Sequence, residues 1–309
     1  MNTPQSDKSS TLLLVDGTAV AYRAFFAVRH LSAPDGHAVN CVFGFIRALR
    51  HLFDAFAPDR ALVAFDGGSP AFRLDNCPDY KGQRAPMPDD LRSQLPLLDD
   101  FLDAAGIPRC RIPHQEADDI LATAATDAES HGWNVRIATS DKDLMQLVTP
   151  SVHLVSPCKD LAILDPPAVE AKTGVRPDQI VHWLALIGDV ADNIPGVPGI
   201  GPVTASKLLA QHQTLDGIYA ALPTLAPPSL RSKLADARPR TDTNIVLMTL
   251  DRHVPGVPAL ADLPPPVPAS SAPLTAFYDR HALHAFASER LFFPPLPPPP
   301  PAPTQLSLF

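Results

Sequence analysis

The chain has 309 residues, of which 45% are hydrophobic and 19% charged, and its net charge at pH 7 is −8. This length suits a two-lobed domain or two small domains, and the regular apolar runs before Leu222 exclude a fully disordered chain. The 37 prolines are roughly twice the usual share and concentrate after Leu222. Taken alone, the acidic balance argues against a nucleic-acid partner.

No apolar run is long enough to span a membrane, and the polar first ten residues contain no apolar signal core. We therefore expect a cytoplasmic protein. The four cysteines show no paired spacing, which predicts isolated, reduced thiols; they are Cys41, Cys77, Cys110 and Cys158.

Three apolar segments end in aspartate and predict buried strands: Leu12–Asp16, Ala61–Asp66 and Val135–Asp141. Because they lack polar alternation, they are typical of parallel strands covered on both faces. A fourth strand is expected at Val152–Ser156, with helices over Val39–Phe56 and Asp118–Glu129. The alternation predicts an α/β fold with a central, mostly parallel sheet and flanking helices, whose ligands gather at the carboxyl ends of the strands.

The second half of the chain predicts helices from about residue 168 to 250, interrupted most sharply at Asn193–Pro202 and continuing over Val203–Gln211. The Pro-rich stretch 253–273 predicts an irregular loop, and Leu274–Leu291 predicts an amphipathic helix. Pro294–Pro303 predicts an extended polyproline spacer. We expect a disordered N-terminus over 1–10, an α/β domain over 11–175, a helical subdomain over 176–291 and a Pro-rich disordered tail over 292–309.

Acidic residues cluster at the strand ends and in three short motifs. They are Asp16, Asp66, Glu116, Asp118, Asp119, Asp141, Asp143, Asp189 and Asp192. Each alone fits ordinary turn or helix-capping chemistry. Converging in one crevice, they must be neutralised, and all-oxygen ligands favour Mg²⁺ or Mn²⁺. Two or more such ions, roughly 4 Å apart, can clamp a phosphoryl displacement; they also offset the acidic charge, which removes the objection to a nucleic-acid partner.

Five motifs occur in a specific order: Val15-Asp-Gly, Tyr80–Leu91, Glu116–Asp119, Ser140–Val148 and Gly188–Gly201. Over about Leu12 to Leu291 the chain resembles the 5′→3′ nuclease domain of bacterial DNA polymerase I, within the flap endonuclease superfamily. The resemblance implies a nuclease core related to the PIN class and a helical arch at about 70–112. It also implies a helix–three-turn–helix at about 186–211.

The resemblance implies two groups of metal ligands. The first contains Asp16, Asp66, Glu116 and Asp118, with Asp119 beside them, and the second contains Asp141, Asp143, Asp189 and Asp192. Lys81 and Arg84 match the arch residues that contact the scissile phosphate, and Tyr22 and Arg23 are expected to contact DNA. We expect Arg73 and Arg92 to be ordinary solvated side chains.

The glycine-rich turn resembles a site that binds the duplex backbone through amide groups and a helix N-terminus. The residues expected there are Gly196, Gly199, Gly201 and Lys207, with a potassium ion held by backbone carbonyls. Where the family often has Glu-Lys, this chain has Pro202-Val203. One candidate phosphate contact is thereby removed, and Lys207 is the candidate to compensate for it.

The C-terminal sequence is similar to the peptide by which bacterial replication proteins bind the sliding clamp. Gln305 would supply a hydrogen-bonding amide, and Leu306, Leu308 and Phe309 would supply apolar anchors. The remaining alternative is a tail that docks on its own domain. We expect a monomer, associated with the nucleoid and not fused to a polymerase domain.

These features predict a structure-selective, metal-dependent 5′ nuclease that acts on DNA flaps, nicks and RNA primers. A toxin-like ribonuclease of the PIN class would be shorter and lack the arch and the glycine-rich turn. A phosphatase of the haloacid-dehalogenase type shares Asp16-Gly-Thr18 but needs a nucleophilic aspartate where this chain has Leu14. The third alternative is a non-catalytic, clamp-tethered protein that binds flaps.

Overall fold

The structure is a computed structural model that describes residues 10–157, 160–265 and 272–286. Its centre is a six-stranded sheet in the order β3-β2-β1-β4-β5-β6. The strands are β1 (Thr11–Asp16), β2 (Arg60–Ala64), β3 (Arg109–Cys110), β4 (Asn134–Ala138), β5 (Val152–Val155) and β6 (Ile163–Leu164). All neighbours pair in parallel except β5 and β6. The four strands predicted from the sequence are therefore confirmed.

The continuous apolar run of β1 is explained by burial on both faces of the sheet. Leu13 and Val15 face one hydrophobic cluster, and Leu12 and Leu14 face another. The first cluster includes α1 (Gly17–Ala27), α2 (Asn40–Phe56) and α4 (Asp89–Ala104), whereas the second includes α5 (Ala117–Ser130). Because helices cover both faces of the sheet, polar side chains can reach solvent at the carboxyl ends of the strands. We call this end of the sheet the sheet edge.

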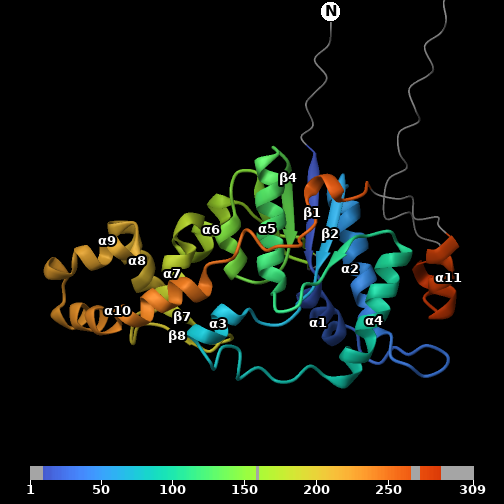
Figure 1. Ribbon diagram of the computed structural model, residues 1–309, viewed down its shortest axis with the longest axis horizontal. Helices are drawn as coiled ribbons and strands as arrows, with labels where there is room; N and C mark the ends of the chain where they lie inside the picture. The colour runs from blue at the N-terminus through green and yellow to red at the C-terminus, as the bar shows by residue number, and fades with distance from the viewer. Residues whose placement is uncertain (1–9, 158–159, 266–271, 287–309) are drawn as a thin grey trace, which may run out of the picture.

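A helical lobe extends the cluster on the α5 face (Figure 1). Its helices are α6 (Pro166–Thr173), α7 (Ile180–Ile187), α8 (Pro202–His212), α9 (Leu215–Ala220) and α10 (Pro228–Met248). Between α7 and α8 lies a two-stranded hairpin of β7 (Gly188–Asp189) and β8 (Ile194–Pro195). The described residues also form short 3-10 turns at Asp143–Leu147, Pro177–Gln179, Leu222–Thr224, Leu260–Asp262 and His284–Phe286.

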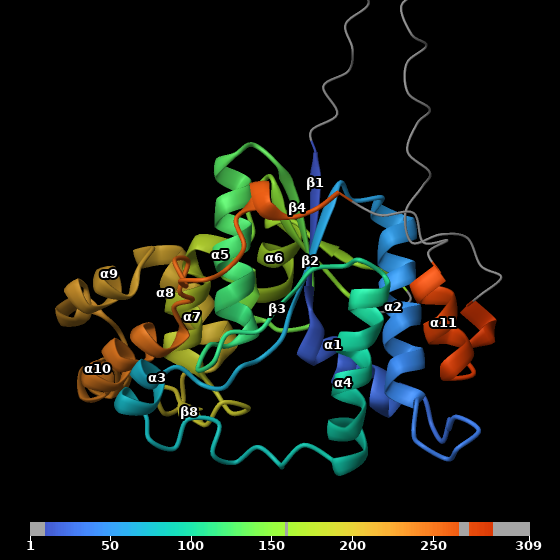
Figure 2. The same cartoon turned by 45° about the vertical axis from the view of Figure 1, so that its right-hand side comes forward.

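The segment between β2 and β3 forms the expected arch, but it is less helical than predicted. It begins with α3 (Ala71–Asn76) and ends with α4, and the chain between them passes below the ends of the strands (Figure 2). Tyr80–Leu91, expected as part of a helical arch, is helical only from Asp89; residues 78–84 form turns instead. A positive φ of 56° at Lys81 is incompatible with a continuous helix there.

The last described helix, α11 (Ala272–Arg280), packs on the α/β part of the molecule. Phe277 lies against Phe101 of α4, with ring centroids 5.8 Å apart. Arg50 of α2 donates a hydrogen bond of 2.7 Å to the carbonyl of Phe286. The amphipathic helix expected over Leu274–Leu291 thus ends at Arg280, and residues 287–291 lie outside the described ranges.

Other expectations have mixed outcomes within the described ranges. Residues 253–265 contain turns and one 3-10 segment, as the proline content predicts, whereas residues 266–271 lie outside the described ranges and Ala272 and Pro273 belong to α11. Cys41 and Cys110 are buried and Cys77 is half-buried, all three unpaired, whereas Cys158 lies outside those ranges. No described helix has both the length and the apolar character needed to cross a bilayer.

The β7-β8 hairpin depends on the close approach of two glycines. Gly188 has a φ of 75°, and a Cβ on Gly196 would collide with the Ile187 carbonyl. Gly196→Ala should therefore lower the free energy of unfolding by about 1–3 kcal/mol, the usual cost of forced overpacking. Urea denaturation measures the change.

Gly201→Ala is the matched control, because a Cβ at Gly201 meets no atom within 4 Å. Because Gly201 is the N-cap of α8, where glycine is preferred to alanine, this change should cost about 0.5–1 kcal/mol. Equal destabilisation by the two substitutions would contradict the steric explanation.

Candidate metal centre and nucleic-acid interface

A pocket of about 500 Å³ lies at the carboxyl ends of the central strands. Four of the predicted carboxylates line it, and residues of the arch line it as well. The carboxylates are Asp16, Asp66, Asp118 and Asp141, and the arch residues include Lys81, Arg84 and Met87. The structure therefore brings together acidic and basic groups that are separated by up to 125 residues in the sequence.

Asp16 is fixed in this pocket by its own helix. It is the last residue of β1 and caps α1, accepting a 2.9 Å hydrogen bond from the Ala19 amide and a 3.0 Å bond from the Thr139 hydroxyl. Burial, reinforced by the charges of Asp66 and Asp141, raises the pKa of Asp16 to about 7 despite those two bonds. The carboxylate form of Asp16 is thus short of compensating positive charge.

The neighbouring carboxylates of Asp118 and Asp141 also lack sufficient compensating positive charge. Burial and the charges of Asp141, Asp16 and Asp66 raise the pKa of Asp118 well above its usual range. Burial also raises the pKa of Asp141, with the charges of Asp192 and Asp189 adding to it. Asp66 is exposed and accepts a 2.8 Å bond from the Ala117 amide at the start of α5. Divalent cations would relieve this repulsion, and oxygen-only donors suit hard cations.

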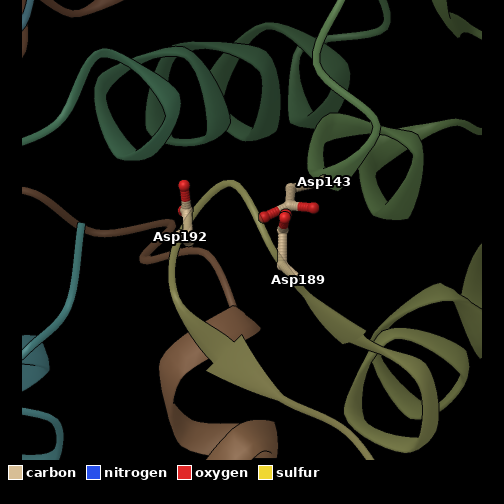
Figure 3. A group of neighbouring side chains, drawn as sticks. All are labelled: Asp143, Asp189 and Asp192. Atoms are coloured by element: carbon tan, nitrogen blue, oxygen red, sulfur yellow. The ribbon is translucent and has the colours of Figure 1, made fainter. Parts of the chain in front are cut away.

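A second acidic group lies between the 3-10 turn Asp143–Leu147 and the β7-β8 hairpin (Figure 3). Asp143, Asp189 and Asp192 each offer a carboxylate oxygen, and these three oxygens lie within 4.8 Å of one another. Asp189 is the last residue of β7 and Asp192 lies in the loop between β7 and β8, and the Asp189 carboxylate points toward that of Asp143. Oδ1 of Asp143 is buried and has no hydrogen-bond partner. An orphaned buried oxygen beside two further carboxylates fits a divalent cation, because a buried acceptor without a partner is costly.

Burial raises the pKa of Asp143 well above its usual range, and the charges of Asp141, Asp189 and Asp192 raise it further. Lys142 partly compensates this group, since its Nζ lies 3.2 Å from Oδ2 of Asp189. Asp141 couples the two acidic groups, because it lines the pocket and also interacts with Asp189 and Asp192.

Glu116 and Asp119 are held differently from the other carboxylates. Arg73 reaches both, with distances of 2.6 and 2.8 Å to the two oxygens of Asp119. Asp119 also accepts a 2.9 Å bond from the Asp251 amide. Both oxygens of Asp119 are thus engaged by protein donors, so a cation at Asp119 would have to displace one of them.

The expectation that Arg73 is a solvated side chain is wrong. Its relative exposure is 1%, and its Nε donates a 3.1 Å bond to the Leu247 carbonyl of α10. Burial opposes its charge, but Asp119 and Glu116 outweigh that effect and raise its pKa. Arg92 is exposed, as expected.

The basic arch residues face the acidic groups directly. Lys81 Nζ lies 2.8 Å from Oε1 of Glu116, and Arg84 pairs with Oδ1 of Asp192. Burial disfavours the Lys81 ammonium, but the charges of Glu116 and Asp192 raise its pKa overall. The two cations predicted to contact a phosphate are therefore located beside the carboxylates.

Sequence reasoning missed Tyr80, which is 6% exposed. Its hydroxyl lies 3.1 Å from both Oε2 of Glu116 and Oδ2 of Asp192. Burial, followed by these two charges, raises its pKa. The available signal was its position directly before Lys81 in the arch motif.

The predicted DNA contacts are divided among three places. Tyr22 is half-buried and lines the pocket, whereas the exposed Arg23 lines a separate groove with Arg47 and His51. Gly196, Gly199, Gly201 and Lys207 lie in the loop before α8 and on α8 itself, with Lys207 exposed. The clamp-like residues Gln305, Leu306, Leu308 and Phe309 lie outside the described ranges.

The α8 N-terminus has a feature that the sequence did not indicate. Val203, where the family often has lysine, is 68% exposed. Lys233 of α10 lies against the same loop. Its Nζ is so close to Gly199 that a Cβ added to this glycine would be 2.6 Å away from it. A cation from another helix is therefore present beside the turn that lacks one of its own.

A sheet edge bearing two carboxylate groups beneath an arch, joined to a helical lobe, matches one protein family. Residues 11–174 match the 5′-3′ exonuclease N-terminal resolvase-like domain, and residues 175–270 match the 5′-3′ exonuclease C-terminal SAM fold. The chain belongs to the 5′-3′ exonuclease family.

Among curated relatives, the chain is similar to DNA polymerase I of Bacillus caldotenax, with 39% identity over 255 residues, 82% of this chain. It is also 39% identical over 231 residues, 75% of this chain, to the thermostable DNA polymerase I of Thermus aquaticus. The matched part spans 29% and 27% of those two relatives, respectively.

Solved structures share the fold. A phage T5 5′-exonuclease with zinc bound superimposes with a TM-score of 0.66 at 24% identity, covering 78% of this chain and 90% of that one. The catalytic core of Rad2 in complex with a DNA substrate gives a TM-score of 0.56 at 18% identity, covering 88% of each chain.

Removing the Arg73 charge tests the buried network. Arg73→Met should lower the free energy of unfolding by about 3–5 kcal/mol, since it strands the buried Asp119 and removes one partner of Glu116. Arg92→Met, on the exposed side of α4, should stay within about 0.5 kcal/mol of the parent. Urea denaturation of both variants provides the comparison, and a loss of similar size in the two would show that Arg73 is not specifically required.

Proposed function

We propose that this protein is a structure-selective 5′→3′ exonuclease and flap endonuclease that depends on Mg²⁺ or Mn²⁺. It hydrolyses phosphodiester bonds near the 5′ ends of DNA flaps, nicks and RNA primers during replication and repair. The observation that carries the proposal is the meeting of both carboxylate groups with the basic arch residues around one sheet edge.

The donor set supports two cation positions. The first cation would be held by the four carboxylates that line the pocket: Asp16, Asp66, Asp118 and Asp141. Glu116 lies next to this position and is paired with Lys81. Asp143, Asp189 and Asp192 would hold the second, where the buried oxygen of Asp143 requires a partner. When bound, divalent cations activate water as a nucleophile and stabilise charge on phosphate oxygens.

The arch residues would position the substrate. Lys81 and Arg84 line the pocket and carry positive charge toward it, so they can stabilise the charge that develops on the phosphoryl oxygens. The half-buried Tyr22 lines the same pocket. Its ring can stack on a displaced base, a contact worth about 1–3 kcal/mol.

The helical lobe would bind the duplex next to the cut. The Gly199–Gly201 turn and the N-terminus of α8 offer backbone amides to phosphates. With Val203 uncharged, Lys207 on the exposed face of α8 and Lys233 beside Gly199 supply the positive charge. A potassium ion coordinated by backbone carbonyls of this turn also belongs to the proposal. Because these contacts reach only the backbone, selection depends on DNA shape.

The proposed metal ligands can be tested by single substitutions. Asp141→Ala and Asp189→Ala should each lower the cleavage rate by about a hundredfold or more, because each removes a ligand of a cation that would stabilise the developing phosphoryl charge, while flap binding stays measurable. The assay incubates labelled flap, nicked and blunt DNAs with Mg²⁺ and maps the cut positions, and EDTA should abolish every product.

Asp54→Ala, an exposed change on α2, is the matched control and should cleave normally. Full activity of the Asp141 and Asp189 variants would refute the site assignment. Flap binding by the parent protein, without cleavage at any Mg²⁺ concentration, would instead favour the non-catalytic flap-binding alternative.

We also propose that the terminal Gln305–Phe309 segment binds the bacterial sliding clamp. The proline tract before it would act as an extended spacer of about 3 Å per residue, so tethering would raise the local concentration of the nuclease on DNA. The apolar character of Leu306, Leu308 and Phe309 supports an apolar groove as their receptor.

Calorimetry with a purified bacterial clamp tests this partner. The double substitution Leu308→Ala/Phe309→Ala should abolish the heat of binding, because it removes two of the three apolar anchors. Flap cleavage without the clamp should stay unchanged and serves as the control. Unchanged clamp affinity in the double variant would exclude this role for the segment.

A further inference from the structure

The carboxylate of Asp192 is engaged by two parts of the molecule at once. It belongs to the acidic trio with Asp143 and Asp189. Its Oδ1 also pairs with Arg84, and its Oδ2 accepts a 3.1 Å bond from the Tyr80 hydroxyl. Lys81 Nζ lies 3.9 Å from the same Oδ2. Both oxygens of this candidate ligand are therefore bound by the arch.

The backbone reinforces this connection between the arch and the hairpin. The Lys81 amide donates a 3.0 Å bond to the Asp192 carbonyl, and the Asn193 side chain donates a 3.0 Å bond to the Asp79 carbonyl. We call this set of contacts, between residues 79–84 and residues 192–193, the arch clasp. It holds the first half of the arch against the β7-β8 hairpin, which carries Asp189 and Asp192.

The clasp and a divalent cation compete for one carboxylate. A cation held by the trio needs an oxygen of Asp192, and the guanidinium of Arg84 on that carboxylate repels it. The Arg84 side chain is 49% exposed and lines the pocket, so it has space to leave Asp192.

We propose that a divalent cation bound at Asp143, Asp189 and Asp192 opens the arch clasp and frees Arg84 to engage a phosphate in the pocket. This inference rests on the proposed function, because it assumes the second cation position. Asp192 then has two alternating roles, as anchor of the arch without the cation and as its ligand with it.

Linkage makes the proposal measurable without DNA. If cation and clasp exclude each other, loss of the clasp must tighten cation binding by the same factor by which the cation weakens the clasp. Arg84→Gln should therefore bind Mg²⁺ about five-fold more tightly or better, the lower end of typical coupling. Arg92→Gln, an exposed arch-side arginine, is the matched control and should bind Mg²⁺ like the parent.

The experiment combines calorimetry of Mg²⁺ binding to the full chain with hydrogen exchange at residues 79–84. In the parent, Mg²⁺ should speed exchange of the Lys81 amide, whose acceptor is the Asp192 carbonyl. In Arg84→Gln, which removes the guanidinium contact from the clasp, this amide should already exchange faster than in the parent without Mg²⁺, and Mg²⁺ should change it less. In Asp189→Ala, which removes a ligand but leaves the clasp, exchange should stay slow in both conditions.

The outcomes separate the two levels of the proposal. Mg²⁺ binding with unchanged exchange at residues 79–84 overturns the clasp and leaves the cation site standing. Tighter binding by Arg84→Gln without an exchange response shows simple charge repulsion and also overturns the clasp. Absence of Mg²⁺ binding, together with cleavage that resists EDTA, overturns the proposed function and the clasp with it.

Discussion

Carboxylates at the ends of β1, β2 and β4 and at the start of α5 share one partly buried region, and burial together with mutual repulsion raises the pKa values of Asp16, Asp118 and Asp141. A region of this kind is unfavourable unless positive charge enters it. The molecule supplies some of that charge itself, through Lys81 of the arch and through Lys142. The proposed cations would supply the remainder, and so the shortage of positive charge at this sheet edge is the basis of both the proposed chemistry and the proposed arch clasp.

Burial of the sheet on both faces is what concentrates the deficit at one edge. Leu12 through Val15 are at most 1% exposed, so after Thr11 the strand β1 has no polar residue until Asp16. Parallel pairing of β1 with β2 and β4 then directs the ends of all three strands to the same side. The same packing that stabilises the core therefore forces the acidic residues together.

Arg73 connects three parts of the molecule that surround this sheet edge. It lies on α3 at the start of the arch, pairs with Asp119 on α5, and donates to Leu247 on α10. Since its partners are buried, loss of Arg73 alone would leave buried negative charge without compensation. Arg73 thus joins the arch, the α/β core and the helical lobe, whereas Arg84 joins the arch and the hairpin through an exposed side chain that can move.

The sequence by itself determined the strands, the main helices and the acidic residues at the strand ends, because uninterrupted apolar runs and Asp-Gly endings are local patterns. It also indicated Lys81 and Arg84 through a motif. Only the tertiary structure decided which charges meet: it paired Asp119 with Arg73, buried an arginine expected at the surface, and placed Tyr80 between Glu116 and Asp192. It likewise brought Lys233 to Gly199. Contacts between residues tens of positions apart depend on packing angles and burial, which no local pattern encodes.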